Sequence, residues 1–341
     1  MIKVSIILPV YNVEPFIERC IESVMAQNCS NIDIECIIVD DCGQDSSMEI
    51  VRQRISAYSG PISFIVLKHD KNQGLSVARN TGMNHATGDF LFFMDSDDYI
   101  TDNCLEKLIS PILNNSAIDV VKGNHIGRVE FVVSRIPTIP LDNDTLLNLF
   151  YRSVIQVMAW NTLIRRSLIV KYQLSFRPGI LFEDNLWSAQ LYRHVENFLF
   201  VHDKTYYYED GNHNSITGNK VLYNKQKEVL SFIVTVEELL KCFDTNHFVT
   251  YTFFVVSFFM KMMDMILKDG QMEKDTKRKI YQLRNQLMKY TLCHFRIFLA
   301  LLELWLFSPF RQLMRFRWFR THYDFFSRTI YALAMSFNKL H

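Results

Sequence analysis

Three carboxylates stand within the four-residue run DSDD (95–98), directly after the apolar run 90–94. Like charges this close repel one another, so a cation, bound water or a tight turn has to offset the repulsion. A divalent cation is one candidate, because Mg²⁺ and Mn²⁺ take oxygen ligands and usually keep water and substrate phosphates as the others. A turn leading into a helix near Thr101 is the second, because Asp and Ser are common in turns and caps.

A second pair of carboxylates lies in VDD (39–41), again at the end of an apolar run. Asp41 can accept hydrogen bonds from a base N–H or a ribose hydroxyl, although the nearby Gly43 also allows a plain turn. Tyr11, in PVYN (9–12), offers an aromatic surface beside such a pocket, or else belongs to a capped helix start.

A single arginine, Arg79, lies between two glycines in GLSVARNTG (74–82), on a predicted helix. A planar guanidinium is well matched to a diphosphate, although an arginine on the protein surface explains the same residue. The chain has neither a GxGxxG nor a Walker-type loop, which excludes Rossmann-type NAD binding and P-loop chemistry.

The elements that position these residues are short apolar strands alternating with helical patterns. This alternation predicts an α/β fold with a mostly parallel sheet covered by helices. Ligands bind such sheets beyond the carboxyl ends of the strands, which brings the polar runs above to one edge. The predicted strands are Lys3–Pro9, Ile34–Val39, Ile62–Leu67, Phe90–Met94 and Ile118–Lys122.

The composition is that of a folded protein: of 341 residues, 49% are hydrophobic and 13% aromatic. The formal net charge of +1 gives no overall field that would attract nucleic acid, so we expect no nucleic-acid partner. Seven scattered cysteines without metal-type spacing predict reduced thiols in a cytosol. The N-terminal MIKVSIILPVYN reads as a first strand rather than a signal peptide.

Taken in order, these motifs closely resemble the family 2 glycosyltransferases of GT-A fold, of the kind that builds bacterial surface polysaccharides. The resemblance is dense over the first third of the chain, where the order of the motifs is more specific than any one of them. It continues more thinly through MAWNTLIRRSLI (158–169), FEDNLW (182–187) and NSIT (214–217).

The resemblance implies a role for each of eight residues. Pro9, Tyr11 and Asp41 lie around the nucleotide base, Arg79 near the nucleotide or its diphosphate, Asp95 near the ribose, Asp97 on the metal with Asp98 beside it, and Asp184 is the catalytic base. One departure concerns the usual DDGS motif, which is DDCG here, with Cys42 where glycine is expected. This departure puts the conformation of the local turn in question.

The implied reaction is an inverting transfer from a nucleotide-diphosphate sugar, for which we expect a UDP-sugar, assisted by Mn²⁺ or Mg²⁺. The acceptor is a saccharide or a lipid-linked saccharide, and Asp184 takes the proton from its attacking hydroxyl. Glu183 is adjacent, but neighbours on a helix or turn face different ways, so we expect only Asp184 to point into the cleft. A helix start, with acidic residues near the positive end of the dipole, also explains FEDNLW.

Two other functions are weighed against this one. A nucleotidyltransferase that makes a sugar nucleotide would need a glycine-rich, basic loop after the first strand, and PVYNVEPF is not such a loop. A non-catalytic sugar-nucleotide-binding or scaffold protein of a membrane-associated assembly complex is the stronger alternative. The metal aspartates together with Asp184 argue against it.

We expect a GT-A catalytic domain over 1–218, with a nucleotide-binding half 1–125 and an acceptor-side half 126–218, then a helical region 219–341. Within that region, 247–267 and 292–307 are apolar but carry charges, so neither is a clean transmembrane segment. The basic, aromatic run 308–320 suits a membrane interface, although a helix packed on the catalytic domain is the alternative. We therefore expect a cytoplasmic protein with peripheral contact through 292–320 at the inner face of the cell membrane.

Overall fold

The computed structural model describes most of the first two thirds of the chain and scattered positions further on. The described residues are 1–29, 32–127, 133–212, 225–242 and single positions or short runs between 244 and 286. The chain divides into two compact units, Met1–Thr235 and Val236–His341, and the division falls inside helix α8 (Lys225–Lys241). The domain boundary predicted at 218/219 lies outside the described residues.

The described residues form one eight-stranded sheet in the order β3-β2-β1-β4-β7-β6-β8-β5. All five predicted strands are confirmed, within one to four residues at either end. The strands are β1 (Ile2–Val10), β2 (Ile32–Asp40), β3 (Ser63–Lys68), β4 (Phe90–Phe93), β5 (Tyr99–Ile100), β6 (Val120–Ile126), β7 (Thr162–Arg165) and β8 (Phe198–Tyr207).

The strands run parallel in the first half of the sheet and mixed in the second. β1 pairs with β2 and β4, and β2 with β3, all parallel. β7 is antiparallel to both β4 and β6, β8 is parallel to β6, and β5 is antiparallel to β8. The prediction of a mostly parallel sheet flanked by helices is confirmed.

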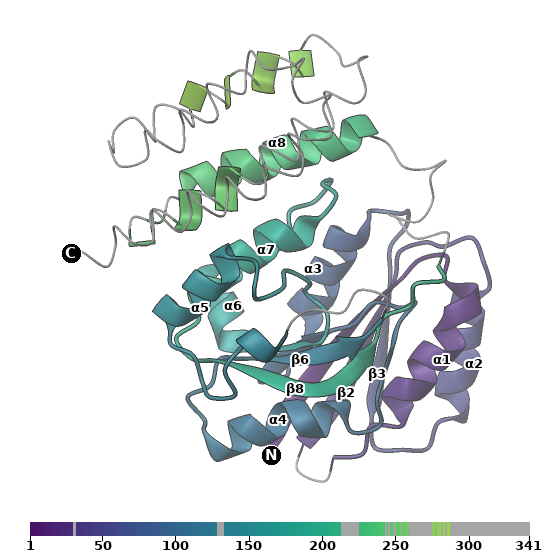
Figure 1. Ribbon diagram of the computed structural model, residues 1–341. Coiled ribbons are helices and arrows are strands. Elements are labelled where there is room, and N and C mark those ends of the chain that lie inside the picture. The colour runs from purple at the N-terminus through teal and green to yellow at the C-terminus, as the bar shows by residue number, and fades with distance from the viewer. Residues whose placement is uncertain are drawn as a thin grey trace. The chain divides into compact units, whose positions relative to one another are not determined.

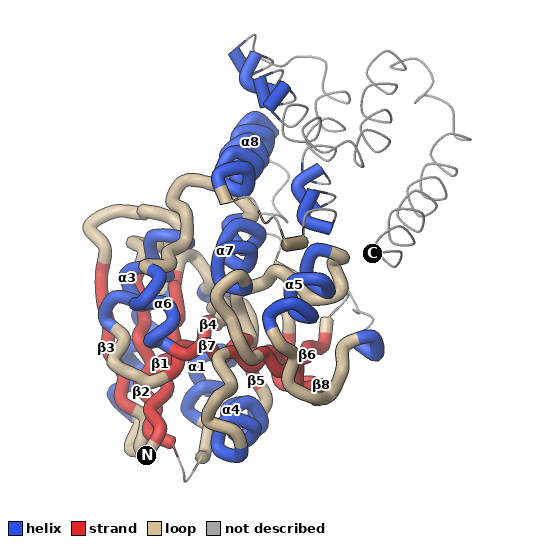
Figure 2. Tube along the Cα trace, turned by 90° about the vertical axis from the view of Figure 1, so that its left-hand side faces the viewer, coloured by secondary structure: helices blue, strands red, loops and turns tan. Residues whose placement is uncertain are grey.

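Helices cover both faces of this sheet (Figures 1 and 2). Helices α1, α2 and α4 pack on one face, and α3 and α7 lie on the other. A strand covered on both sides needs apolar residues at successive positions, which is why β1 and β2 are nearly continuous apolar runs. The helices are α1 (Glu14–Met25), α2 (Ser47–Ala57), α3 (Leu75–His85), α4 (Cys104–Asn114), α5 (Asn143–Tyr151), α6 (Arg166–Tyr172), α7 (Glu183–Tyr192) and α8 (Lys225–Lys241), with a 3₁₀ turn at Val133–Arg135.

Gly82 lets α3 approach the sheet closely. A Cβ at this position would lie 2.6 Å from Cγ2 of Ile7 on β1 and 3.3 Å from Cγ2 of Val39 on β2. Only a residue without a side chain fits, and the close contact brings the earlier turn of α3, which carries Arg79, to the carboxyl edge of the strands.

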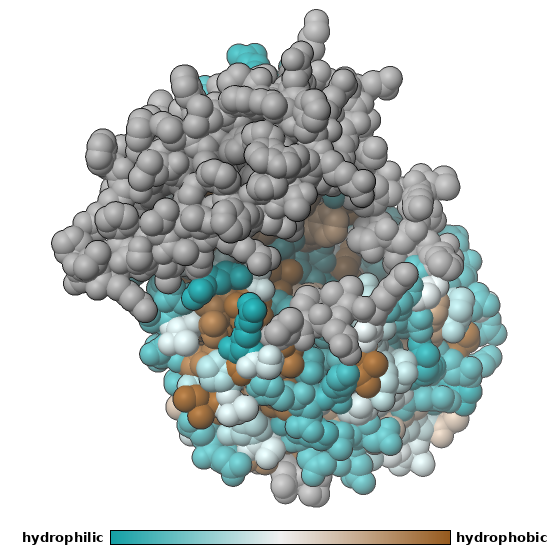
Figure 3. Space-filling model, viewed as in Figure 1, coloured by the Kyte–Doolittle hydropathy of each residue, from teal (hydrophilic) through white to brown (hydrophobic). Residues whose placement is uncertain are grey.

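The described surface in the view of Figure 3 is mainly hydrophilic, with apolar residues in small groups. No helix within the described residues is long and apolar enough to cross a membrane. The predicted membrane-contacting stretch 292–320 lies outside the described residues.

Candidate functional site

The acidic loop 95–98 leaves the carboxyl end of β4, as the strand pattern predicts. The backbone N–H of Asp98 donates to the carbonyl oxygen of Asp95 over 3.2 Å, so the run does form a turn. The turn and the binding site are therefore not exclusive interpretations, because the turn is what presents the side chains at the edge of the sheet.

Arg79 is the centre of a buried charge cluster. Its Nη1 lies 2.8 Å from Glu183 Oε1 and 2.8 Å from Asp184 Oδ1, and its Nη2 lies 2.8 Å from Asp95 Oδ1. Its side chain is 1% exposed, and the guanidinium carbon lies 5.1 Å from the centre of the Phe176 ring. Burial opposes the charge, but the three carboxylates outweigh it and raise the pKa of Arg79 above its ordinary value.

This geometry changes the role that we expect for Arg79. The sequence suggested a surface residue or a diphosphate ligand, and the surface interpretation is wrong because the side chain is fully enclosed. Both Nη atoms bind carboxylates of the protein itself, so the arginine holds the acidic groups in place. Direct contact with a diphosphate stays a prediction.

Glu183 and Asp184 begin α7, after Phe182 in a left-handed conformation with φ 58°. Both carboxylates reach Nη1 of Arg79, and the expectation that only Asp184 points into the cleft stays a prediction. The side chain of Asp184 is 19% exposed and that of Glu183 9%. Asp184 is therefore the carboxylate more open to a ligand.

Burial is the main electrostatic effect on this pair. It raises the pKa of Glu183 to about 7, helped by the neighbouring Asp184 and opposed by Arg79. It also raises the pKa of Asp184, against the favourable charge of Arg79 and a hydrogen bond from the backbone amide of Ala159. A raised pKa makes a carboxylate a stronger base, which suits a group that has to accept a proton near neutral pH.

Asp98 anchors the acidic loop through two hydrogen bonds. Its Oδ2 accepts a hydrogen bond from the Tyr206 hydroxyl at 2.6 Å, and its Oδ1 accepts one from the Glu209 backbone N–H at 2.8 Å. The side chain is buried, and burial together with the charge of Asp97 raises its pKa well above the ordinary value. Both oxygens are in use, so its contact with a metal stays a prediction.

Asp97 is the aspartate of the loop best fitted to hold a metal. It accepts a hydrogen bond from the Asn212 side-chain amide at 2.8 Å, and no lysine or arginine among the described residues forms an ion pair with it. Burial and the charge of Asp95 raise the pKa of Asp97. A raised pKa is expected of a carboxylate that has too little positive charge near it. The described residues contain no group of three metal-type side chains, so Asp97 fits a cation that takes its other ligands from phosphate and water.

Asp41 is buried and orders the loop before α3. Its Oδ1 lies 2.7 Å from His69 Nδ1 and accepts from the backbone N–H of Gln73, while Oδ2 accepts from that of Gly74. Its contact with a nucleotide base stays a prediction. Tyr11, 43% exposed just after β1, presents a free aromatic surface at the same edge. Pro9 is buried near the carboxyl end of β1.

Cys42 occupies a turn position at which the resemblance led us to expect glycine. Its φ is 61°, in the left-handed region that a side chain disfavours. The turn nevertheless forms: the Cys42 N–H donates to Asp40 Oδ1 at 3.0 Å, and Sγ lies 3.7 Å from the Asp70 carbonyl oxygen. The departure from glycine is tolerated at the cost of local strain.

Sequence reasoning missed two residues near the acidic groups, Tyr206 and Lys122. Tyr206 on β8 anchors Asp98 and stacks on Trp160 with ring centres 4.6 Å apart. Lys122 on β6 is 1% exposed and lies close enough to Asp184 for their charges to interact. The available signal for Lys122 was a lysine inside an otherwise apolar strand, because a buried charge needs a reason.

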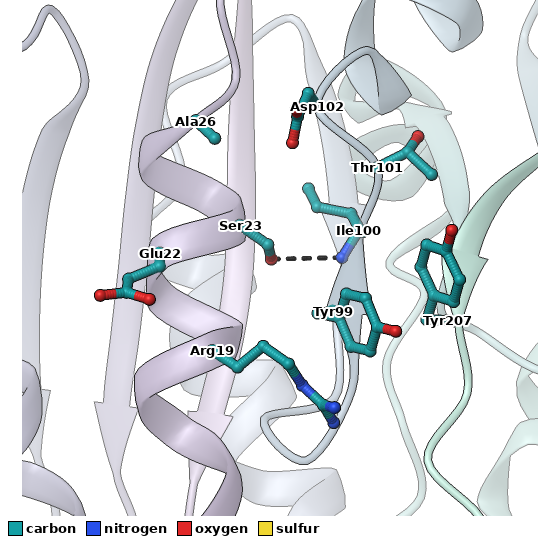
Figure 4. A pocket seen from close by; sticks show the side chains of 9 residues that line it. All are labelled: Arg19, Glu22, Ser23, Ala26, Tyr99, Ile100, Thr101, Asp102 and Tyr207. Atoms are coloured by element: carbon teal, nitrogen blue, oxygen red, sulfur yellow. Dashed lines mark hydrogen bonds between the residues drawn. The ribbon is translucent and has the colours of Figure 1, made fainter.

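An open groove of about 500 Å³ lies beside the acidic loop, between α1, β5 and β8 (Figure 4). Tyr99 and Tyr207 stack in it with ring centres 4.3 Å apart, and Arg19 covers Tyr99 and pairs with Glu209 at 2.7 Å. None of the predicted donor, metal or base residues lines the groove. It is a neighbour of the candidate site, not the site itself.

Comparison with known proteins gives consistent matches. The model of the family described as glycosyl transferase family 2 matches residues 5–172. The glycosyltransferase EpsJ of Bacillus subtilis is 34% identical over 63% of this chain and 62% of its own length. The poly(ribitol-phosphate) beta-N-acetylglucosaminyltransferase TarP of Staphylococcus aureus is 30% identical over 64% of this chain and 69% of its own length.

Among solved structures, S. aureus TarS 1–349 in complex with UDP-GlcNAc aligns with a TM-score of 0.64 and 19% identity. The alignment covers 84% of this chain and 81% of that one, a likeness of fold. The match spans about three fifths of EpsJ and 30% of the glycosyltransferase GlyA of Streptococcus pneumoniae. The mixed sheet and its acidic edge agree with these matches. The chain therefore belongs to glycosyltransferase family 2 and has the GT-A fold.

Proposed function

We propose that this protein transfers a sugar from a nucleotide-diphosphate donor to a saccharide or lipid-linked saccharide, with inversion at the anomeric carbon. The donor is a UDP-sugar, the reaction depends on Mn²⁺ or Mg²⁺, and the product belongs to a bacterial surface polysaccharide. The protein acts in the cytoplasm, with peripheral contact at the inner face of the cell membrane through 292–320.

The observation that carries the proposal is an indirect connection between Asp97 and Asp184 at one edge of the sheet. Asp97 lies in the same loop as Asp95, and Arg79 binds both Asp95 and Asp184. Asp97 pairs with no lysine or arginine among the described residues and suits a metal. Asp184 is held by an arginine, remains partly exposed and has a raised pKa. A metal-bound leaving group and a general base are the two things that a displacement at a sugar carbon needs.

Asp97 would hold the divalent cation, which when bound stabilises the negative charge on a departing nucleotide diphosphate. Asp98 and Tyr206 fix the loop under it. Tyr11 and Asp41 border the space for the base, and Asp95 faces the ribose.

Asp184 accepts the proton of the acceptor hydroxyl. Its Oδ1 is fixed by Arg79, which leaves the rest of the carboxylate for the hydroxyl. A general base in such a position contributes on the order of 10²–10⁴-fold to the rate. Asp184→Asn should remove that factor and leave donor binding nearly unchanged.

The relatives guide the choice of donor. TarP is named as an N-acetylglucosaminyltransferase acting on poly(ribitol-phosphate), and TarS has been solved with UDP-GlcNAc and with UDP. UDP-GlcNAc is therefore the first donor to test, followed by other UDP-sugars and by GDP-mannose, which the Pyrobaculum calidifontis mannosyltransferase binds with Mn²⁺.

The test is a thermal-shift panel of sugar nucleotides with and without Mn²⁺, on wild type, Asp97→Asn and Asp184→Asn. A ligand at about 100 times its Kd stabilises a protein by about 2.7 kcal/mol. We expect one nucleotide series to stabilise wild type and Asp184→Asn only with metal, and to lose its effect in Asp97→Asn. Donor binding without hydrolysis or transfer under any condition would favour the non-catalytic scaffold instead.

A further inference from the structure

The chain that leads into Glu183 and Asp184 bends at Leu181–Phe182. Phe182 has φ 58°, and its side chain makes no capping hydrogen bond to α7. A residue other than glycine is strained in this left-handed conformation and keeps it only where its surroundings hold it. Asn185 holds one side of the bend, because its backbone N–H and its side-chain amide donate to the Phe182 carbonyl oxygen at 3.1 and 3.0 Å. The N–H of Leu181, on the other side, needs a partner from outside α7.

Helix α8 supplies that partner through Ser231. The Ser231 hydroxyl oxygen accepts the backbone N–H of Leu181 at 2.8 Å and donates to the carbonyl oxygen of Lys227, one turn earlier in α8, at 2.7 Å. A hydroxyl has a single proton to donate, so the bond to Lys227 leaves its lone pairs for the Leu181 N–H. Because Ser231 is 2% exposed, water has little access to take its place as the acceptor.

The next residue of α8, Phe232, holds the side chain of the bend. Its ring stacks on that of Phe182 with ring centres 5.7 Å apart and an interplanar angle of 27°. Phe232 is buried, and an aromatic pair of this kind adds a preferred geometry to the burial of its area. Two successive residues of α8 therefore fix the backbone at Leu181 and the side chain at Phe182.

The bend leads directly into the two carboxylates that bind Arg79. Glu183 Oε1 and Asp184 Oδ1 each lie 2.8 Å from the same nitrogen atom, Nη1 of Arg79. Hydrogen bonds weaken with distance and with poor alignment, so a rotation of the first turn of α7 would draw at least one carboxylate away. The bend is therefore a route by which α8 can act on Asp184.

We propose that Ser231 and Phe232 are positioning residues of the candidate site. They hold the bend Leu181–Phe182, and the bend keeps Asp184 on Arg79 in the orientation that proton transfer needs. The clause on proton transfer rests on the proposed function. Helix α8 begins at Lys225, after the motifs that carried the resemblance, and the resemblance implied no role for it.

The first experiment follows the start of α7 without any turnover. Hydrogen exchange of the Asn185 backbone amide is measured by NMR in ¹⁵N-asparagine-labelled protein, and the signal is identified by its loss in Asn185→Ser. Ser231→Ala and Phe232→Leu should each speed this exchange by roughly tenfold, the factor expected when about one hydrogen bond or ring contact is lost.

Thr235→Val is the matched control for this measurement. It removes another buried hydroxyl of α8, whose hydrogen bond goes to the Ser231 carbonyl oxygen inside the helix. Exchange of the Asn185 amide in this variant should stay within about twofold of wild type.

The second experiment compares kcat with donor affinity. Ser231→Ala should lower kcat by roughly tenfold, because a slightly misplaced base is costly, and keep donor affinity within about twofold of wild type. Ser231→Thr keeps the hydroxyl and should restore kcat, and Thr235→Val should leave kcat unchanged. In the Asp184→Asn background, Ser231→Ala should change kcat by less than about twofold, because both changes act on one step.

Unchanged Asn185 exchange in both α8 variants would overturn the proposal. A loss of kcat on Ser231→Ala that is as large without the Asp184 carboxylate as with it would overturn it too, because α8 would then act by another route. If exchange speeds up while Asp184→Asn keeps full kcat, α8 does position the carboxylate, and it is the proposed role of Asp184 as base that fails.

Discussion

Two regions of the unit Met1–Thr235, the proposed nucleotide side and the proposed acceptor side, hold their polar residues in different ways. On the nucleotide side, Asp41 is fixed by two backbone N–H groups and a neighbouring histidine. On the proposed acceptor side, Glu183 and Asp184 are fixed by the buried cation Arg79. Backbone amides cannot lose a proton in the working range of pH, whereas buried charges balance only while each group keeps its ionisation state. The two backbone contacts of Asp41 are therefore expected to tolerate changes of pH, and the charge cluster around Arg79 to respond to them.

The largest effect should come from removing the cation that joins the halves. Arg79→Met leaves three carboxylates without their shared partner and should cost about 3–5 kcal/mol of unfolding free energy, the usual cost of leaving buried charge uncompensated. Urea unfolding near pH 7 measures it. Arg54→Met, which removes an exposed arginine, is the control and should cost less than about 1 kcal/mol. Equal costs for the two variants would mean that the cluster is not the link between the halves.

The next effect tests the pH response of the acceptor side. Because the pKa of Glu183 is raised from 4.5 to about 7 on folding, the folded chain binds this proton more tightly. The contribution of Glu183 to stability is fully present below about pH 4.5 and is lost as pH rises through 7. Glu183→Gln should therefore gain on wild type by about 1–3 kcal/mol between pH 5 and 8.

Denaturant unfolding at four pH values in that window measures the difference between the two proteins. Glu49→Gln, an exposed position on α2, is the matched control and should run parallel to wild type. A constant difference between Glu183→Gln and wild type would contradict the assigned electrostatics.

A smaller effect is expected from the nucleotide side, where packing matters more than charge. Gly82→Ala places a methyl group 2.6 Å from Ile7 Cγ2, so α3 has to shift. We expect a loss of about 1–3 kcal/mol, independent of pH. Asn84→Ala, exposed on the same helix, should be neutral or slightly stabilising. If Gly82→Ala were instead stabilising, as helix propensity alone predicts, the close approach of α3 would not constrain the site.

The smallest effect concerns the turn after β2. Cys42→Gly relieves a left-handed side chain and should stabilise the protein by about 0.5–1 kcal/mol, partly offset by the greater freedom of glycine in the unfolded chain. Differential scanning calorimetry is sensitive enough to follow it. Cys42→Ala keeps the strain and is the control, which should show no gain.

Much of the fold could be predicted from the sequence because apolar runs and turn residues are local signals. β1, β2 and β4 are buried over most of both faces, so their sequences are mainly apolar. Strand direction was less accessible: β7 is antiparallel to β4 through a pairing between Phe92 and Leu163, and no local pattern encodes it. The short β5 depends on pairing with β8 and has no periodicity of its own.

The candidate site was predictable in position and less so in its internal contacts. The carboxyl-end rule places the acidic loop correctly. What it cannot show is that Arg79 binds residues more than a hundred positions away, or that Asp98 turns to Tyr206. These contacts depend on how separate elements pack, and a residue type alone leaves several partners open.

The ion pairs of Arg79 also bear on how the protein is made. Arg79 and Asp184 are 105 positions apart, so the arginine emerges from a ribosome long before α7 does. Until then the early strands can pair, but the arginine has only Asp95 to bind. Contacts of such separation close late because chain entropy opposes them. The cluster that holds Glu183 and Asp184 should thus delay a competent site until the chain has grown past α7.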